Sequence, residues 1–361
     1  MKNTFTKSTV AIGFVAALAI TGCQNDFDNI KTESLPISND QQVAIQGLAQ
    51  IEKSIVSNFV TATANLYNGV TTFESVTSDP NLVQLQNLWK LARNPWESNE
   101  SFAFGPVENE GIDGNSDDWP FDITAFASIL NSSQVLDQAY VTQMTTTTKG
   151  FHAIEYLLFG LDGAKTATDF TARELLMLDL LTSDLNTQAN KLNSSWTTGT
   201  TNSFYDAYVS AGAGSDLYPT TQAALGDVLG SMVDITDELP NSKIQIPLTL
   251  QSSAYLESRF SDYSYYDYLN NLNGVYAAYT GQYGDITTQK NFSSLVVAAN
   301  PSVNDKAITQ FKLCIALMEL IQPASMNQAI IIKQDQLKEI VTELQKLNKI
   351  LDEDVREVLG L

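Results

Sequence analysis

The sequence predicts an all-α protein, built as two helical bundles of about four helices each that pack side by side. After residue 40, apolar residues recur every three or four positions, which is the period of an amphipathic helix. Signals for strands are sparse. A Trp-Thr-Thr-Gly-Thr-Thr-Asn segment at 196–202 interrupts the helical period near the middle. We therefore expect an N-terminal bundle over 41–198 and a C-terminal bundle over 199–361.

The first 22 residues have the features of a secretory signal peptide. Lys2 and Lys7 supply positive charge ahead of an apolar run at 10–20, which is too short to cross a bilayer. Two small residues and then Cys23 follow. This order resembles the lipobox of bacterial lipoproteins, in which the cysteine is diacylated and becomes the mature N-terminus. We expect a signal peptide over 1–22 and lipidation of Cys23.

The cysteines and the polar segment after the signal point to a lipid-anchored envelope protein. Residues 23–40 are polar and show no periodicity, as in a tether between a lipid and a folded domain. If Cys23 carries lipid, Cys314 is alone and no disulfide forms, so stability depends on packing. The expected location is the outer membrane, at its periplasmic face or on the cell surface, with the membrane as a partner through the lipid.

The first two helices are the clearest. The second begins cleanly at Asp79, because Pro80 suits the first helical position, and it carries Leu82, Leu85 and Trp89 inward. The apolar positions expected to face inward on the first helix are Val43, Ile45, Leu48, Ile51, Ile55 and Val60.

The rest of the chain divides at glycine, proline and asparagine. A loop is expected at 105–119, followed by short helical pieces up to the segment 149–160, and 244–250 reads as a brief extended connector between prolines. Long helices are expected at roughly 168–192, 203–237, 252–280, 304–321 and 327–358.

Charge and missing motifs exclude several functions. The formal charge is -21, from 20 basic and 41 acidic residues, so nucleic-acid binding is not expected. With His152 as the sole histidine, sites that need two imidazoles are excluded, such as the zincin pair or the paired Glu-x-x-His of di-iron bundles. No phosphate-binding loop or dinucleotide glycine pattern occurs, so no nucleotide cofactor is expected.

The remaining polar residues in apolar surroundings could form a site. His152 and Glu155 are three apart and share one face of a strongly apolar helix, and Glu97 and Glu100 repeat that spacing. Ordinary alternatives stay open for each: a hydrogen-bonded structural pair for His152, a solvated face for Glu97 and Glu100, and for Glu257 a surface ion pair with the nearby arginine.

Four blocks of sequence resemble the imelysin family. Gly150 to Glu155 is similar to its Gly-x-His-x-x-Glu signature, and 88–106 is similar to its block of Trp, Arg, paired Glu and Phe-Gly-Pro. Asp118-Trp119-Pro120 resembles its Trp-Pro step. The C-terminal block resembles the family at Glu257, Ser258, Arg259, Asp267, Asn270, Asn271 and Tyr279. The resemblance implies a two-domain helical fold with a site near the domain interface, and an envelope protein linked in some members to iron uptake.

Three functions follow from these residues. The favoured function is binding of a metal ion, iron above all, or of an iron-linked ligand, and its partners would be proteins of iron uptake. The reason is that one imidazole among carboxylates forms a hard, oxygen-rich ligand set. A metal-assisted peptidase is the second, since relatives are named for insulin cleavage. A peptide-binding or purely structural polar site is the third. The candidate metal ligands are His152, Glu155, Glu97 and Glu100, and the candidate ligand-binding residues are Arg93, Trp119, Glu257, Ser258 and Arg259.

Overall fold

The computed structural model describes residues 39–199 and 203–361, and Ile37–Leu361 form one compact unit. Among the described residues, the regular elements are helices apart from one short hairpin, which confirms the all-α prediction. The division at residue 198 stays a prediction. The signal peptide, Cys23 and most of the tether lie outside the described residues. None of the described helices combines the length and hydropathy needed to cross a membrane.

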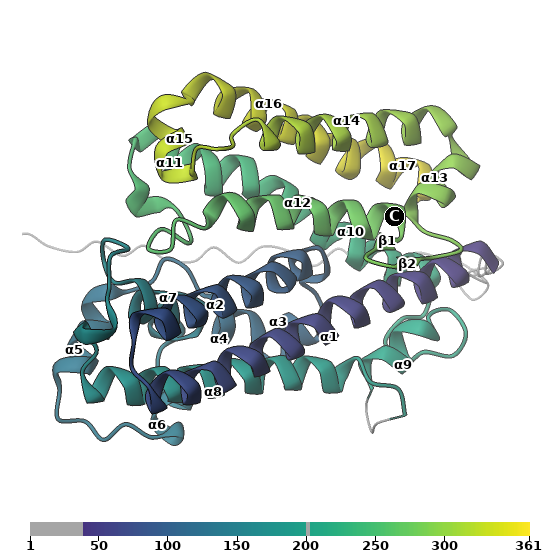
Figure 1. Cartoon of the computed structure of the whole chain (residues 1–361). Helices are drawn as coiled ribbons and strands as arrows, with labels where there is room; N and C mark the ends of the chain where they lie inside the picture. The colour runs from purple at the N-terminus through teal and green to yellow at the C-terminus, as the bar shows by residue number, and fades with distance from the viewer. Residues whose placement is uncertain (1–38, 200–202) are drawn as a thin grey trace, which may run out of the picture. The chain divides into compact units, whose positions relative to one another are not determined.

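The first group of helices surrounds α1 (Asn39–Ser75), which packs against both α2 (Asp79–Asn99) and α8 (Ala172–Ser195) (Figure 1). α7 (Gly150–Phe159) fills the space between α2 and α8. The buried apolar residues of α1 recur at helical spacing, so one stripe faces its neighbours. Four shorter helices connect these elements: α3 (Pro106–Asn109), α4 (Ile112–Asp117), α5 (Ile123–Asn131) and α6 (Gln138–Gln143).

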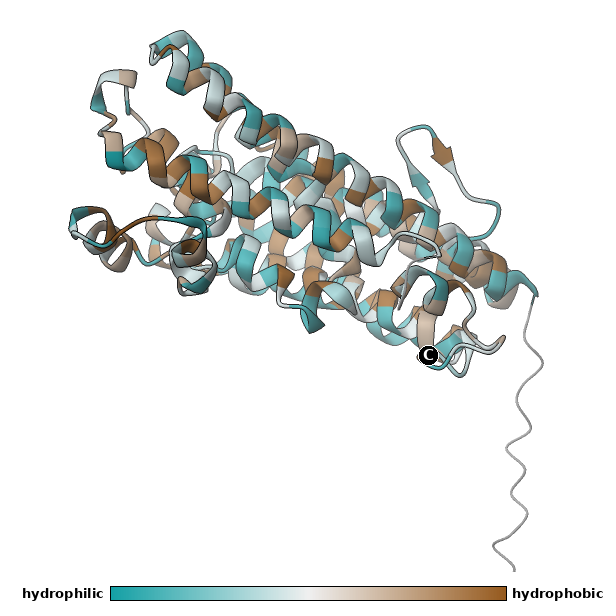
Figure 2. Cartoon of the chain, turned by 90° about the horizontal axis from the view of Figure 1, so that it is seen from below, coloured by the Kyte–Doolittle hydropathy of each residue, from teal (hydrophilic) through white to brown (hydrophobic). Residues whose placement is uncertain are grey.

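The second group consists of α10, α12, α14 and α16, drawn in teal-green to yellow in Figure 1. Apolar and polar residues interleave along the long helices of both groups (Figure 2), as expected of amphipathic helices with one buried face. The long helices of this group are α10 (Thr221–Glu238), α12 (Ser264–Thr280), α14 (Pro301–Glu319) and α16 (Gln334–Lys349). α9 (Phe204–Val209) packs against α1 of the first group. The shorter elements of the second group are α11 (Gln245–Leu250), α13 (Phe292–Ala299), α15 (Met326–Ile332), α17 (Arg356–Leu359), β1 (Gln282–Tyr283) and β2 (Ile286–Thr287).

Several predicted boundaries in the first half and middle of the chain were wrong. The loop expected at 105–119 contains α3 and α4, because Val107 and Ile112 are buried and hold these short helices against the core. The connector expected at 244–250 is helical. Pro247 is buried in α11, which continues directly from the π-helical segment Leu239–Ile244.

Three of the long predicted helices are also interrupted. The span 203–237 is split into α9 and α10 by a turn whose glycines, Gly212 and Gly214, have positive φ. In the span 252–280, α12 begins only at Ser264. The span 327–358 breaks after α15 and ends in a π-helical segment, Ile350–Val355. Periodicity alone therefore overestimated helix length wherever a buried residue in a turn continues the apolar pattern.

α12 lies along α2 at very close range, and this contact joins the two groups of helices. Gly274 on α12 faces the backbone of Ser98, and a Cβ at Gly274 would overlap the Ser98 carbonyl. The absence of a side chain therefore allows the two backbones to approach. The same approach brings Asn271, one turn earlier, against Glu97.

Replacement of Gly274 by alanine is expected to destabilise the protein by about 1–3 kcal/mol, because the added methyl group has no space. Gly226 provides the matched control, since a Cβ there meets nothing within 4 Å. Gly226→Ala should be neutral or stabilise by roughly 0.5–1 kcal/mol through helix propensity. Urea unfolding of both variants measures the difference. Equal stability of the two would contradict the close contact.

A buried charged cluster and an acidic pocket

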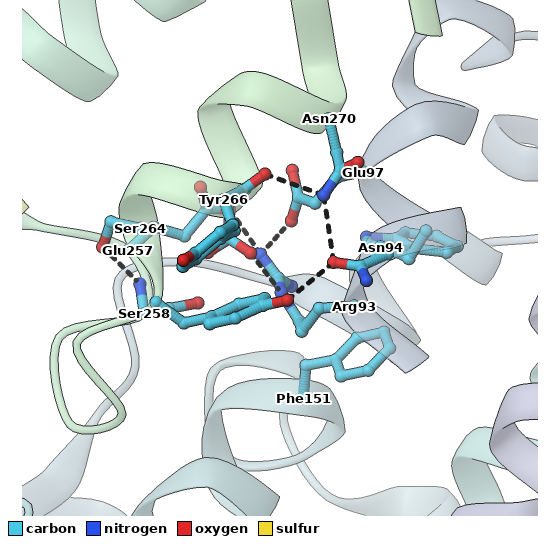
Figure 3. Close-up of polar contacts among 12 residues, drawn as sticks. Arg93, Asn94, Glu97, Phe151, Glu257, Ser258, Ser264, Tyr266 and Asn270 are labelled. Atoms are coloured by element: carbon cyan, nitrogen blue, oxygen red, sulfur yellow. Dashed lines mark hydrogen bonds and ion pairs between the residues drawn. The ribbon is translucent and has the colours of Figure 1, made fainter. Parts of the chain in front are cut away.

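The centre of the site is Arg93, a fully buried side chain on α2. Its guanidinium forms ion pairs with Glu97 and Asp117, and Nη2 and Nε lie 3.4 Å from Glu257 and 3.3 Å from Asp267. Figure 3 shows Arg93 and Glu97 facing Glu257, with the ring of Phe151 against the guanidinium. A buried charge is costly unless it is paired, and Arg93 is paired on four sides.

Local sequence explains why these groups converge. Arg93 and Glu97 are four apart on α2 and so lie on one face of the helix. The Trp96 indole N–H, on the same helix, donates to Asp117 at 2.6 Å and holds the end of α4 against α2. Asp267 comes from α12, so the arginine binds carboxylates from three separate helices.

His152 is placed against Asp117 by the glycine of its own motif. Nε2 of His152 lies 3.2 Å from Oδ1 of Asp117, and Nδ1 lies 3.7 Å from Glu155. Gly150 has φ +70°, and a Cβ there would overlap the Ser116 carbonyl. Because Gly150 has no side chain, the end of α4 can reach the start of α7, which brings Asp117 to the imidazole.

Glu155 faces away from the arginine, toward the segment before α12. Its Oε1 accepts hydrogen bonds from the backbone N–H and the hydroxyl of Ser261, at 2.8 and 2.7 Å. The two polar residues of the motif thus hold different partners: His152 holds Asp117 of α4, and Glu155 holds the loop that carries Glu257.

Beside the cluster is a pocket of about 180 Å³. Asp117 and Glu257 belong to both the cluster and the pocket wall. Lys243 is the one basic residue of that wall, against six carboxylates. Within the described residues, no hydrogen bond or ion pair reaches the half-buried side chain of Glu100. The residues that line the pocket are Glu100, Asp113, Asp117, Asp118, Trp119, Glu238, Lys243, Tyr255, Glu257 and Tyr268.

The charges of the cluster shift its pKa values in opposite directions. Burial opposes a charge on His152, but the charge and hydrogen bond of Asp117 outweigh it and raise the pKa of His152 to about 9. Despite burial, the Arg93 guanidinium lowers the pKa of Asp117 to about 2. Burial raises the pKa of Glu100 to about 8 and that of Asp267 to about 6. His152 is therefore protonated at neutral pH, and Glu100 retains its proton because burial outweighs the opposing charge of Lys243.

The structure brings most of the predicted site residues together. Arg93, Glu97, His152 and Glu257 meet in the cluster, and Glu155 adjoins it. Glu100 and Trp119 lie in the pocket wall and not beside the imidazole. The backbone N–H of Ser258 donates to the Ser264 hydroxyl.

Arg259 lies apart from the cluster. Its guanidinium donates to the Ala254 carbonyl at 3.2 Å and stacks on Phe260. The alternative that Glu257 forms a surface ion pair with Arg259 was wrong. Glu257 is buried, and its ion-pair partners are Arg93 and Lys243.

Sequence reasoning missed two residues that define the site. Asp117 is the shared partner of Arg93 and His152, whereas the family resemblance indicated its neighbour Asp118, in the Asp-Trp-Pro step. Lys243 immediately precedes the segment 244–250 that was expected to be a connector, and no pattern marks it. Proximity to the Trp-Pro step is the one signal that could have indicated Asp117.

Two groups of side chains have the spacing to share a cation. The first contains Asp117, His152 and Glu257; the second contains Glu97, Glu257 and Asp267. In each group the candidate ligand atoms lie within 4.8 Å of one another. Both groups surround Arg93, whose guanidinium pairs with all three carboxylates of the second group, whereas Asp117 and Glu257 also face the pocket.

These features define a class of helical protein with one buried charged centre between its helices. The sequence profile of the imelysin family, designated peptidase M75, matches residues 56–353. The chain therefore belongs to the imelysin family, as its motifs predicted. The chain is 30% identical to iron-regulated protein A of Synechococcus elongatus over 290 residues. This aligned region covers 79% of this chain and 77% of that protein.

Two solved structures share the fold. A protein from Parabacteroides distasonis, named as an iron-regulated protein A precursor, superposes with a TM-score of 0.74 at 20% identity, covering 87% of this chain and 95% of its own. An imelysin-like protein from Psychrobacter arcticum superposes with a TM-score of 0.73 at 15% identity, covering 91% and 98%.

The pairing of His152 with Asp117 can be tested directly, because the chain has a single histidine. In an NMR titration, His152 should titrate near pH 9, and Asp117→Asn should lower its pKa by at least about one unit through loss of the ion pair. Glu343→Gln, far along α16, should leave it unchanged. An unshifted His152 in Asp117→Asn would show that the carboxylate is not its partner.

Stability should fall as pH rises above about 5. The pKa of His152 is raised from 6.5 to about 9, so its contribution is complete below 6.5 and is lost as pH rises through 9. Glu100, raised from 4.5 to about 8, also binds its proton more tightly in the folded state, and it acts in the same direction. Urea unfolding at several pH values measures this, and Glu100→Gln should show a shallower decline. Greater stability at pH 9 than at pH 5 would be inconsistent with both shifts.

Proposed function

We propose that this imelysin-family protein binds a metal cation, with iron favoured, in its acidic pocket, and that it does so in the cell envelope as part of iron uptake. The observation that carries the proposal is the charge of the pocket wall, six carboxylates against Lys243 alone. Carboxylate oxygens are hard ligands that suit iron, manganese or calcium. A bound cation would supply the positive charge that the pocket lacks.

The pocket-facing carboxylates are the best candidates to hold the ion. Asp117 and Glu257 belong to both the cluster and the pocket wall, and Glu100 and Asp113 line the same pocket, with Asp113 one turn before Asp117 on α4. Arg93 is too deeply buried and too fully paired to leave, so it orients Asp117 and Glu257. His152 acts one step further out, since its Nε2 binds Asp117 and keeps that carboxylate in place.

The relatives support a link to iron. The matched protein of Synechococcus elongatus and the solved structure from Parabacteroides distasonis are both named for iron regulation. The predicted signal peptide and lipidated Cys23 would place the protein in the envelope, where uptake partners would meet it. Both features are read from the sequence and lie outside the described residues.

Two other functions remain as alternatives. The structural one has support in Arg93, whose charge already compensates the surrounding carboxylates. A metal-assisted peptidase would use a pocket carboxylate as general base beside the ion, as the family designation suggests. The experiment below distinguishes both from metal binding. A purely structural site would hold no metal, and a peptidase would cleave an unstructured polypeptide that is incubated with the same purified samples.

The double variant Glu100→Gln, Asp113→Asn is expected to weaken metal binding by about ten-fold or more, since it removes two oxygen ligands. Neither side chain has a partner among the described residues, so folding should be preserved. Protein purified without chelator is analysed for metal, and Fe²⁺ binding is then measured by anaerobic calorimetry. The control, Asp335→Asn with Glu353→Gln, removes two exposed carboxylates elsewhere. Equal metal content in all three proteins would refute the proposal.

A further inference from the structure

Lys243 occupies an unusual position for a lysine. It lies in the π-helical segment Leu239–Ile244 after α10, is 6% exposed, and belongs to the pocket wall. Its Nζ is 3.1 and 3.3 Å from the two oxygens of Glu257 and 3.9 Å from Glu97. The Tyr268 hydroxyl donates to the Lys243 carbonyl at 2.9 Å, which holds this turn against α12.

Glu257 is the carboxylate that both candidate cation groups have in common. Lys243 contacts both of its oxygens, so a metal ion bound to Glu257 would lie within a few ångströms of the ammonium, and the two cations would repel each other. The lysine and the metal therefore compete for the same ligand.

The two cations of the site differ in their freedom to move. Arg93 is fully buried and its planar guanidinium contacts four carboxylates, so it is fixed. Lys243 ends in a compact ammonium on a flexible chain and borders an open pocket. Glu238 and Glu100 line the same pocket and would receive the ammonium if it left Glu257.

We propose that Lys243 is a tethered counter-cation, which holds Glu257 in the absence of metal and is displaced when a metal ion binds. It would thereby set the affinity of the pocket and make loading reversible. The inference rests on the proposed function, because it assumes that the pocket takes a metal ion. It assigns to Lys243 a role that a permanent structural ion pair would not have.

The test uses the whole chain and three variants, with Mn²⁺ as the probe in calorimetry and thermal melting. Lys243→Gln removes the competing charge, so Mn²⁺ should bind about ten-fold or more tightly than in the wild type. Metal-free Lys243→Gln should melt at a lower temperature, because Glu257 loses one of its two ion-pair partners, and Mn²⁺ should restore the loss. Lys243→Arg keeps the charge but holds Glu257 through a rigid fork, so its affinity should fall below that of the wild type.

Lys165→Gln is the matched control, because it removes a lysine that is paired with Glu174 at 2.6 Å and is outside the pocket wall. Its Mn²⁺ affinity should equal that of the wild type. If the wild type binds Mn²⁺ and Lys243→Gln binds it no more tightly, or is not restored by it, the displacement is refuted while the proposed function stands. If neither protein binds Mn²⁺, the proposed function fails and this inference fails with it. If Lys243→Gln alone binds Mn²⁺, Lys243 is a permanent counter-cation in the wild type, and both the displacement and the proposed function are refuted.

Discussion

The structure depends on compensating the charge of one buried arginine. Arg93 has no contact with water, and its guanidinium is stable there only because carboxylates from α2, α4, α12 and the segment before α12 surround it. Each of these carboxylates is itself buried and needs the same cation. Removal of any partner would leave an unpaired charge, so the cluster requires all four elements to be in place together.

The packing of the backbone makes that convergence geometrically possible. Gly274 allows α12 to lie directly on the end of α2, and Gly150 allows the end of α4 to lie directly on the start of α7. The first contact brings Asn271 to Glu97, and the second brings Asp117 to His152. The glycine of the Gly-x-His-x-x-Glu motif is therefore as much a part of the site as the histidine, because it admits the histidine's partner.

The cluster and the pocket beside it have different electrostatic characters. In the cluster, cations and carboxylates alternate, and the pKa of Asp117 falls to about 2 because Arg93 and His152 are close. In the pocket, carboxylates outnumber cations, and burial raises the pKa of Glu100 to about 8. Under the proposed function, a rigid, ion-paired cluster beside a pocket with six carboxylates and one lysine would orient the ligands before a cation arrives.

The sequence by itself determined the helical class, the family, and which polar residues in apolar helices would need partners. These follow from local properties: the 3.6-residue period, motif order, and the cost of burying His152 and Glu155 among apolar neighbours. Tertiary structure alone decided who those partners are. Asp117 and Lys243 lie in a short helix and a π-helical turn whose sequences carry no period, and their roles arise from contacts between segments far apart in the chain. Tertiary structure also decided that Glu100 lies in the pocket wall and not beside His152. The spacing of Glu97 and Glu100 along the chain predicts a shared helix face, but it does not fix the distance from either side chain to a residue on another helix.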